Sequence, residues 1–276
     1  MLHSKFIGRV MLASLLVWFT SAAAQGRDLV LAVSEGTSGG TDHARVIAKY
    51  GPLAQYLSKA GKQKVVVVFA REFSQLEEGM KTGRYDLVMA RPSDYPARGM
   101  RDYGYRYMAH AKPDGQCWLL VRNASPVQTL AQAKGKRWVF PESAAYMSKF
   151  CRAELRDQGI DLDKEKVTYV REQALIAPYL DTAFADVGGV ASYSGVAKGA
   201  DKNGHRVLHK SRAQPYFPMV AGKRVSDTQL QAMQRALAEL PAQSGGKEIL
   251  TQIGIQGFAV DGEDALSKLL TWLEKR

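Results

Sequence analysis

The stretch Gly83-Arg84-Tyr85-Asp86-Leu87-Val88-Met89-Ala90-Arg91-Pro92-Ser93-Asp94-Tyr95 decides the fold class of this chain. Its apolar run, residues 87–90, has strand character and stops at a Pro-Ser pair. Ser93 is a good helix N-cap, and Asp94 then stands in the first turn, where a carboxylate suits the helix dipole. The stretch therefore predicts a strand, a tight turn and a helix N-terminus. Such a junction presents unpaired backbone N–H groups, which suit an anion.

Strand and helix patterns alternate on both sides of this stretch. Residues 29–33 and 65–69 are short apolar runs, the second continuous in β-branched side chains, as buried parallel strands are. Helical patterns follow each run, over 42–60 and 73–82. The repeated order of strand and helix predicts an α/β domain with a parallel sheet and right-handed crossovers.

A second α/β unit follows Tyr103, after a polar turn predicted at Lys112-Pro113-Asp114-Gly115. Because this unit is inserted in the first, we expect two lobes joined by crossing segments near 109–116 and 212–218. Lobe I then comprises residues 25–112 and 217–276, and lobe II residues 113–216. A cleft between two lobes is a natural ligand site, because closure buries a small molecule almost completely.

Residues 1–24 have the layout of a secretory signal peptide. Lys5 and Arg9 form the positive region, residues 10–19 the short apolar region, and 21–24 a small-residue cleavage site. The apolar run is too short to span a membrane comfortably. We therefore expect secretion to a bacterial periplasm.

Charge and motifs exclude several function classes. The net charge is +11, but the basic residues are scattered among acidic ones, so the chain lacks a nucleic-acid footprint. The loop at 36–41 lacks the Gly-Lys-Ser/Thr of a phosphate-binding Walker loop, and no Gly-x-Ser-x-Gly elbow is present. His205 and His209 have a spacing that would suit a metal on a helix, but the residues between them favour a strand. We expect no enzymatic activity, metal or cofactor.

Cys117 and Cys151 are the two cysteines of the chain. In an oxidising compartment they can form a disulfide, or they can remain two buried thiols. The sequence does not give the Cα separation that would decide between these states.

Four segments together resemble the phosphate/phosphite/phosphonate family of ABC-transporter periplasmic substrate-binding proteins, the PhnD-like proteins. The pattern PLAxYL at 52–57, followed by GxxDLxxxxPSxY at 83–95, is specific in combination, and the likeness covers about 28–240. The resemblance implies a type II periplasmic binding fold that closes on a small anionic ligand and delivers it, as a monomer, to an inner-membrane ABC permease. The alternative is a ligand-sensing partner of a membrane receptor or sensor kinase. The four matching segments in full are 49–57, 83–95, 130–137 and 185–190.

The resemblance also implies which residues bind the ligand. Two departures leave the ligand open among phosphonate, phosphite, phosphate and carboxylated or sulfonated relatives: the second-lobe helix start keeps one hydroxyl where phosphonate binders carry several, and Asp94 competes with an anion. Arg91 can offset Asp94 by holding a carboxylate or phosphate with two hydrogen bonds. The implied ligand-binding residues are Thr37, Ser38, Thr41, Arg91, Ser93, Tyr95, Ser143, Tyr146 and Asp186.

Overall fold

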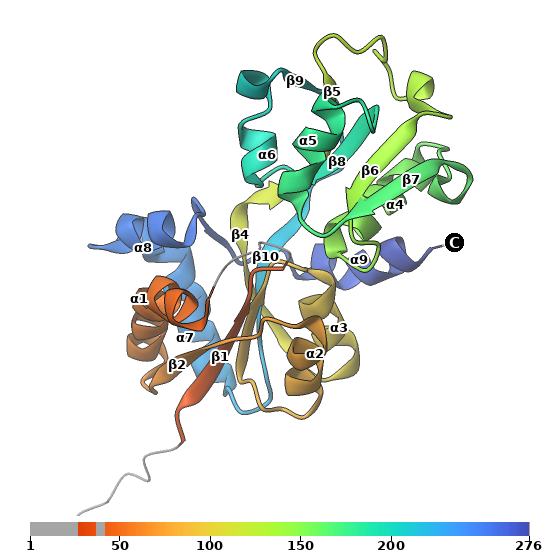
Figure 1. Cartoon of the computed structure of the whole chain (residues 1–276). Coiled ribbons are helices and arrows are strands. Elements are labelled where there is room, and N and C mark those ends of the chain that lie inside the picture. The colour runs from red at the N-terminus through yellow and green to blue at the C-terminus, as the bar shows by residue number, and fades with distance from the viewer. Residues whose placement is uncertain (1–26, 37–41, 276) are drawn as a thin grey trace, which may run out of the picture.

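The computed structural model describes residues 27–36 and 42–275 (Figure 1). The predicted signal peptide and the predicted contacts from Thr37, Ser38 and Thr41 lie outside the described residues. Within them the chain forms two separate sheets, with helices packed on both. Figure 1 shows the two sheets as an upper and a lower part, with α9 (Glu263–Glu274) between them. The mixed α/β architecture predicted from the sequence is confirmed.

The first sheet has six strands in the order β11-β4-β10-β3-β1-β2. Strand β1 pairs in parallel with β2 and β3, as the alternating pattern predicts, and β10 returns antiparallel between β3 and β4. The strands are β1 (Leu29–Ser34), β2 (Val65–Phe69), β3 (Leu87–Ala90), β4 (Arg106–Gly115), β10 (Gln214–Ala221) and β11 (Gly257–Ala259).

Helices cover both faces of the first sheet. Leu29, Leu31 and Val33 of β1 belong to the apolar core beneath α1, whereas Ala32 belongs to the core on the other face, as alternation along a strand requires. Asp42 caps α1 by accepting from the Arg45 amide at 2.7 Å. The helices of the first core are α1 (His43–Gly61), α7 (Asp227–Glu239) and α8 (Gly246–Ile253). Those of the second are α2 (Phe73–Lys81), α3 (Asp94–Asp102) and α9, and this core continues into the helix Tyr146–Asp157 and the second sheet.

The second sheet has five strands in the order β7-β6-β8-β5-β9. Strand β6 is parallel to β7 and β8, and β5 is antiparallel to β8 and β9. The elements are β5 (Cys117–Arg122), β6 (Arg137–Pro141), α4 (Tyr146–Asp157), β7 (Lys166–Val170), α5 (Ile176–Asp181), β8 (Val187–Ala191), α6 (Gly195–Lys198) and β9 (His205–Lys210).

One predicted turn is wrong. The stretch Lys112-Pro113-Asp114-Gly115 lies within β4, which continues to Gly115. The short strand β11 pairs with this end of β4, and Gly257 lies opposite Lys112. The partner strand is 145 residues away in sequence, so local turn chemistry gave no sign of it.

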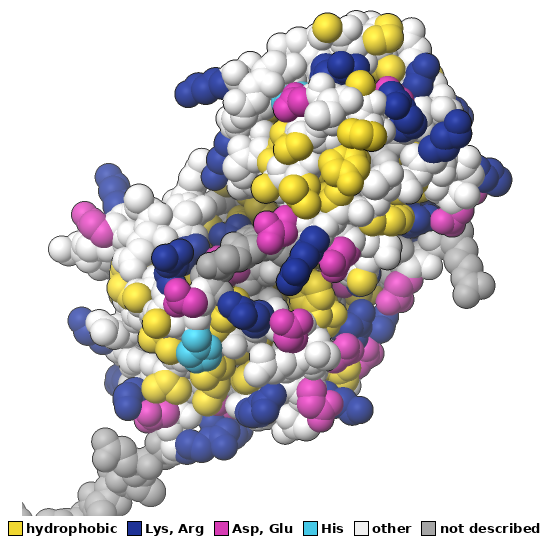
Figure 2. Space-filling model, viewed as in Figure 1, with side chains coloured by type: hydrophobic (Ala, Val, Ile, Leu, Met, Phe, Trp, Pro, Cys, Tyr) yellow, Lys and Arg dark blue, Asp and Glu magenta, His cyan; other side chains and the backbone are white. Residues whose placement is uncertain are grey.

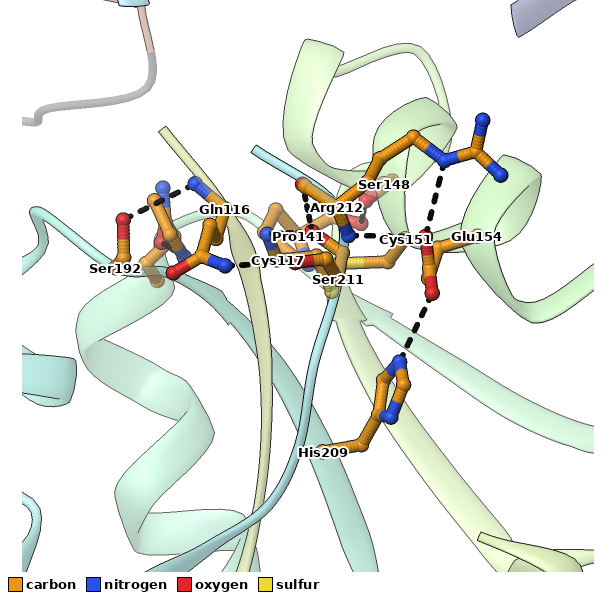
Figure 3. Close-up of a disulfide and its surroundings, with 12 residues drawn as sticks. Gln116, Cys117, Pro141, Ser148, Cys151, Glu154, Ser192, His209, Ser211 and Arg212 are labelled. Carbon is orange, nitrogen blue, oxygen red and sulfur yellow. Dashed lines mark hydrogen bonds and ion pairs between the residues drawn. A yellow bond between two sulfur atoms is a disulfide. The ribbon is translucent and has the colours of Figure 1, made fainter. Parts of the chain in front are cut away.

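Cys117 and Cys151 form a disulfide that joins β5 to α4 (Figure 3). One turn further along α4, Glu154 Oε1 lies 2.9 Å from His209 Nε2, and Glu154 Oε2 accepts from the Arg212 amide at 3.3 Å. Helix α4 is therefore fixed to its own sheet and also to the segment that leads from β9 into β10.

Charged side chains of both signs are mixed over the face of the molecule that Figure 2 shows. This agrees with the scattered basic residues in the sequence. Among the described residues, no helix combines the length and hydrophobicity that crossing a membrane requires.

The disulfide yields a stability prediction. Replacing Cys151 with Ser should lower the free energy of unfolding by about 2–4 kcal/mol, because the crosslink closes a loop with a sequence separation of 34 and so restricts the unfolded chain. Urea unfolding of the wild type and Cys151→Ser measures the difference, and reductant should shift the wild type alone. Equal midpoints for the wild type with and without reductant would contradict the prediction.

Candidate ligand-binding site

A small cavity lies between the two sheets. Its volume is about 30 Å³, against the ~10–15 Å³ that one water molecule requires, so this conformation fits only a group of few atoms. On the first-sheet side, the cavity is lined by residues that follow β1 and β3 and by Phe73 of α2. On the second-sheet side, it is lined by the start of α4 and by Gln173 and Tyr193. The lining residues are Glu35, Gly36, Phe73, Arg91, Pro92, Ala145, Tyr146, Met147, Gln173 and Tyr193.

Strand direction explains why these residues meet. Strands β1 and β3 are parallel neighbours, so their carboxyl ends lie at the same edge of the sheet. Glu35 and Arg91 directly follow the two strands and are brought together there. Ligands of open α/β sheets bind at such carboxyl ends.

Arg91 is the central cation of the cavity. Its guanidinium carbon lies 4.8 Å from the ring centre of Phe217, 5.5 Å from that of Tyr216 and 5.7 Å from that of Tyr193. One terminal nitrogen donates to the Tyr216 hydroxyl, and the other lies 3.8 Å from Glu35 Oε1. Nε is buried and has no hydrogen-bond partner among the described residues. One donor of the guanidinium therefore has no partner within the described part of the chain.

The backbone at Phe217 helps to position the aromatic rings around Arg91. Its φ is +49°, in the left-handed region, and the register of β10 against β4 shifts between Tyr216 and Met219, the interval that contains Phe217. An irregularity of this kind re-aims side chains, and strained backbone is concentrated at functional sites. Here the irregularity lies beside the aromatic rings that enclose the Arg91 guanidinium.

Glu35 holds Arg91 from the other side. Its carboxylate accepts from Lys49 Nζ at 2.6 Å and from the Tyr50 hydroxyl. Burial alone would raise the pKa of Glu35, but the hydrogen bonds from Lys49 and Tyr50 and the charge of Arg91 outweigh it, so the pKa is lowered. Glu35 is thus an anion at neutral pH and balances the arginine.

The start of α4 forms the opposite wall. The first backbone N–H groups of a helix have no carbonyl partner within the helix, and they carry the positive end of its dipole. Tyr146 stands in this turn and is 6% exposed; its buried hydroxyl makes no hydrogen bond of good geometry with the described residues, although the Ser93 side chain is close enough to lower its pKa slightly. Burial raises the pKa of Tyr146 well above its usual value, so the hydroxyl stays protonated and can donate.

Two tyrosines close the cavity across the two sheets. Tyr193 follows β8 of the second sheet and Tyr216 lies on β10 of the first, and their rings stack with centroids 3.8 Å apart. A second cross-sheet contact is the ion pair between Lys149 on α4 and Asp94 on α3, at 2.9 Å. The described chain thus holds the two sheets close around the cavity.

The residues predicted from the sequence fall into two groups. Arg91 and Tyr146 line the cavity. Ser93 is buried next to it and donates to the Pro215 carbonyl at 3.0 Å, and Tyr95 stacks on the lining residue Phe73 at 5.5 Å. The structure therefore brings four of the predicted residues to one place.

Ser143 and Asp186 lie elsewhere. Ser143 is exposed in the turn before α4 and does not line the cavity. Asp186 precedes β8, at the end of the strand opposite to Tyr193, and it pairs with Arg137 at 2.7 Å. This pairing follows from the parallel alignment of β6 and β8.

Sequence reasoning missed Glu35, Phe73, Gln173 and Tyr193 as lining residues. Glu35 had a usable signal, because it directly follows a buried strand whose carboxyl end was expected at the cleft. For Gln173 we find no comparable signal in the sequence.

Comparison with known proteins assigns the family. Residues 40–264 match the family model described as the ABC transporter, phosphonate, periplasmic substrate-binding protein. The chain belongs to this family. The resemblance found in the sequence is confirmed, and the chain is a periplasmic substrate-binding protein of the ABC-transporter class, a family of non-enzymatic proteins. No curated protein matches the chain in sequence.

Solved structures share the fold at low sequence identity. They include a protein from Xanthomonas citri bound to ATP, with 14% identity over 89% of this chain and 97% of that chain and a TM-score of 0.70. PhnD1 from Prochlorococcus marinus in complex with methylphosphonate has 15% identity over 88% and 96%, with a TM-score of 0.66. The aliphatic sulphonate binding protein SsuA from Escherichia coli has 16% identity over 89% and 78%, with a TM-score of 0.59. The predicted type II periplasmic binding fold is confirmed.

The lowered pKa of Glu35 predicts a pH effect on stability. The stability that the ionised group contributes is present above its unfolded pKa, near 4.5, and is lost as the pH falls through the lower folded value. Glu35→Gln should therefore reduce stability by about 1–3 kcal/mol at neutral pH and lose less stability than the wild type on acidification below about pH 4.5. Chemical unfolding across this range measures both effects.

The matched control is Glu78→Gln, an exposed position on α2. It should leave the acid dependence as in the wild type. The prediction is wrong if Glu35→Gln and the wild type lose stability in parallel on acidification.

Proposed function

We propose that this protein binds a small oxyanion, of the phosphonate, phosphite or phosphate type, in the cavity between its two sheets and delivers it to an inner-membrane ABC permease. The observation that carries the proposal is a pair of buried donors with no partner among the described residues. These donors are Arg91 Nε and the Tyr146 hydroxyl, and both residues line the cavity. Buried donors of this kind are costly unless a ligand satisfies them.

The chemistry of the wall suits an anion. A guanidinium offers planar, charge-assisted hydrogen bonds to oxyanions, and an α-helix N-terminus adds backbone donors and a favourable dipole. Arg91 is held in place by Glu35, Tyr216 and the aromatic rings around it. The ligand therefore meets a donor set that is already oriented.

We further infer that the two sheets are the cores of lobe I, residues 25–112 and 217–276, and lobe II, residues 113–216. Hinge closure between them supports ligand capture, since a small ligand would exchange its water for donors from both lobes. The stacked tyrosines and the Lys149–Asp94 ion pair are contacts of the closed form in this proposal. We propose that residues 1–24 direct the chain to the periplasm, where it acts as a monomer.

A ligand panel tests the function. Thermal shift and calorimetry with methylphosphonate, phosphite, phosphate, methanesulfonate and acetate should identify at least one anion that stabilises the protein. Arg91→Gln should weaken binding of that anion by about 10- to 100-fold, because one charge-assisted hydrogen-bonding group is lost.

The control variant is Arg101→Gln, which removes an arginine from the far end of α3 that is 48% exposed and paired with Asp102. It should bind the anion like the wild type. If no anion in the panel stabilises the wild type, the proposed function is wrong.

A further inference from the structure

We propose that Trp272, near the end of α9, is a positioning residue for the ligand site. It holds helix α4, and with it the turn of α4 that lines the cavity, against the first sheet. Its effect on ligand affinity rests on the proposed function. Its effect on the shape of the ligand-free protein does not, so the two can be measured separately.

Helix α9 is attached to the first sheet. It follows β11, which pairs with β4, and it packs against α3 and β10. Its side chains Leu266, Leu269 and Leu270 are buried. Near its end, Glu274 pairs with Arg101 of α3 at 3.1 Å. These contacts give the last turn of α9 a defined position relative to the first sheet.

The last turn of α9 meets α4 through an aromatic side chain (Figure 1). The ring of Trp272 lies edge-on to that of Phe150, with centroids 5.2 Å apart, and its Nε1 donates to Asp157 Oδ2 at 2.7 Å. The guanidinium carbon of Arg212 lies 4.8 Å from the centre of the Trp272 ring. Arg212 belongs to the segment that leads from β9 into β10. Trp272 therefore contacts both the helix of the second sheet and a segment that joins the two sheets.

Helix α4 also binds the backbone of α9. The last carbonyl groups of a helix have no partner within the helix, and they carry the negative end of its dipole. Arg156 of α4 donates to the carbonyl of Trp272 at 2.9 Å and to that of Lys275. The contact therefore fixes the end of α9 by hydrogen bonds as well as by the aromatic ring.

The same helix α4 lines the cavity at its start. Residues 145–147 line the cavity, whereas Phe150 and Asp157, which contact Trp272, lie about one and three turns later. Coupling between separate sites is carried by packed side chains and rigid helices. The position of the cavity-lining turn therefore depends on how the rest of α4 is held by α9.

Loss of the Trp272 contact would free α4 and the second sheet to move away from the first sheet. A ligand that needs groups from both sides would then bind only the fraction of molecules in which the sheets are close, and its apparent affinity falls with that fraction. Trp272 is not among the residues that line the cavity, so the order of preference among anions should stay the same.

Small-angle X-ray scattering of the ligand-free protein, and calorimetry with methylphosphonate, phosphite and phosphate, compare the wild type with Trp272→Ala. Trp272→Ala should have the larger radius of gyration. It should bind the anions that the wild type binds about tenfold more weakly, because fewer molecules are competent to bind. Trp272→Phe keeps an aromatic ring against Phe150 and should restore most of the affinity.

The matched control is Trp118→Ala, which removes a partly buried tryptophan of β5 that packs in a different apolar cluster from that of α9. It should keep the radius and the affinity of the wild type. Arg156→Gln removes hydrogen bonds to two carbonyl groups of α9 and should act in the same direction as Trp272→Ala. It decides the matter if circular dichroism shows that Trp272→Ala does not fold.

The outcomes separate the two proposals. If Trp272→Ala keeps the radius of the wild type, or binds the anion as tightly, the positioning role is overturned while oxyanion binding stands. The role is also overturned if Trp118→Ala weakens binding as much as Trp272→Ala does. If no anion binds the wild type, the proposed function fails, and the scattering comparison alone decides the role of Trp272.

Discussion

The rest of the site depends on one constraint, the burial of the Arg91 guanidinium between two sheets. A buried cation is stable only when it is paired and hydrogen-bonded. Glu35, just after β1, supplies the countercharge, and the hydroxyl of Tyr216 on β10 accepts a hydrogen bond from the guanidinium. The ring of Phe217 covers one face of the guanidinium. The parallel pair of β1 and β3 and the antiparallel return of β10 are what bring these groups to one edge of the first sheet.

Because the charged side chains at the cavity are paired, the net charge of the protein says little about which ligand the cavity would bind. Arg91 is balanced by Glu35, Glu35 is bound by Lys49, and Asp94 is balanced by Lys149. Charged side chains of both signs are mixed over the face of the molecule in Figure 2, so the net charge does not single out the cavity. In the proposed function, an anion is therefore recognised by the direction of a few hydrogen-bond donors and not by net charge.

The sequence predicted the parts of the site that depend on local pattern. Strand periodicity and the Pro-Ser stop predicted the junction after β3 that holds Arg91, and the family resemblance implied Tyr146. Partners from distant segments could not be predicted, because Tyr216 is 125 residues from Arg91 and β11 is 145 residues from the end of β4 that it extends. The disulfide was undecided for the same reason, since it depends on a Cα separation of 5.4 Å that only the packed fold defines.

Helix α4 connects the site to β5 and to the segment that leads from β9 into β10. Its first turn lines the cavity, Cys151 in its middle is bonded to β5, and Glu154 near its end contacts His209 and the Arg212 amide. Helix α9 shares an apolar core with both sheets and packs on α4 through Trp272 and Phe150, whose ring centroids lie 5.2 Å apart. Any displacement of α4 would therefore carry the second sheet with it, because the disulfide couples the helix to β5.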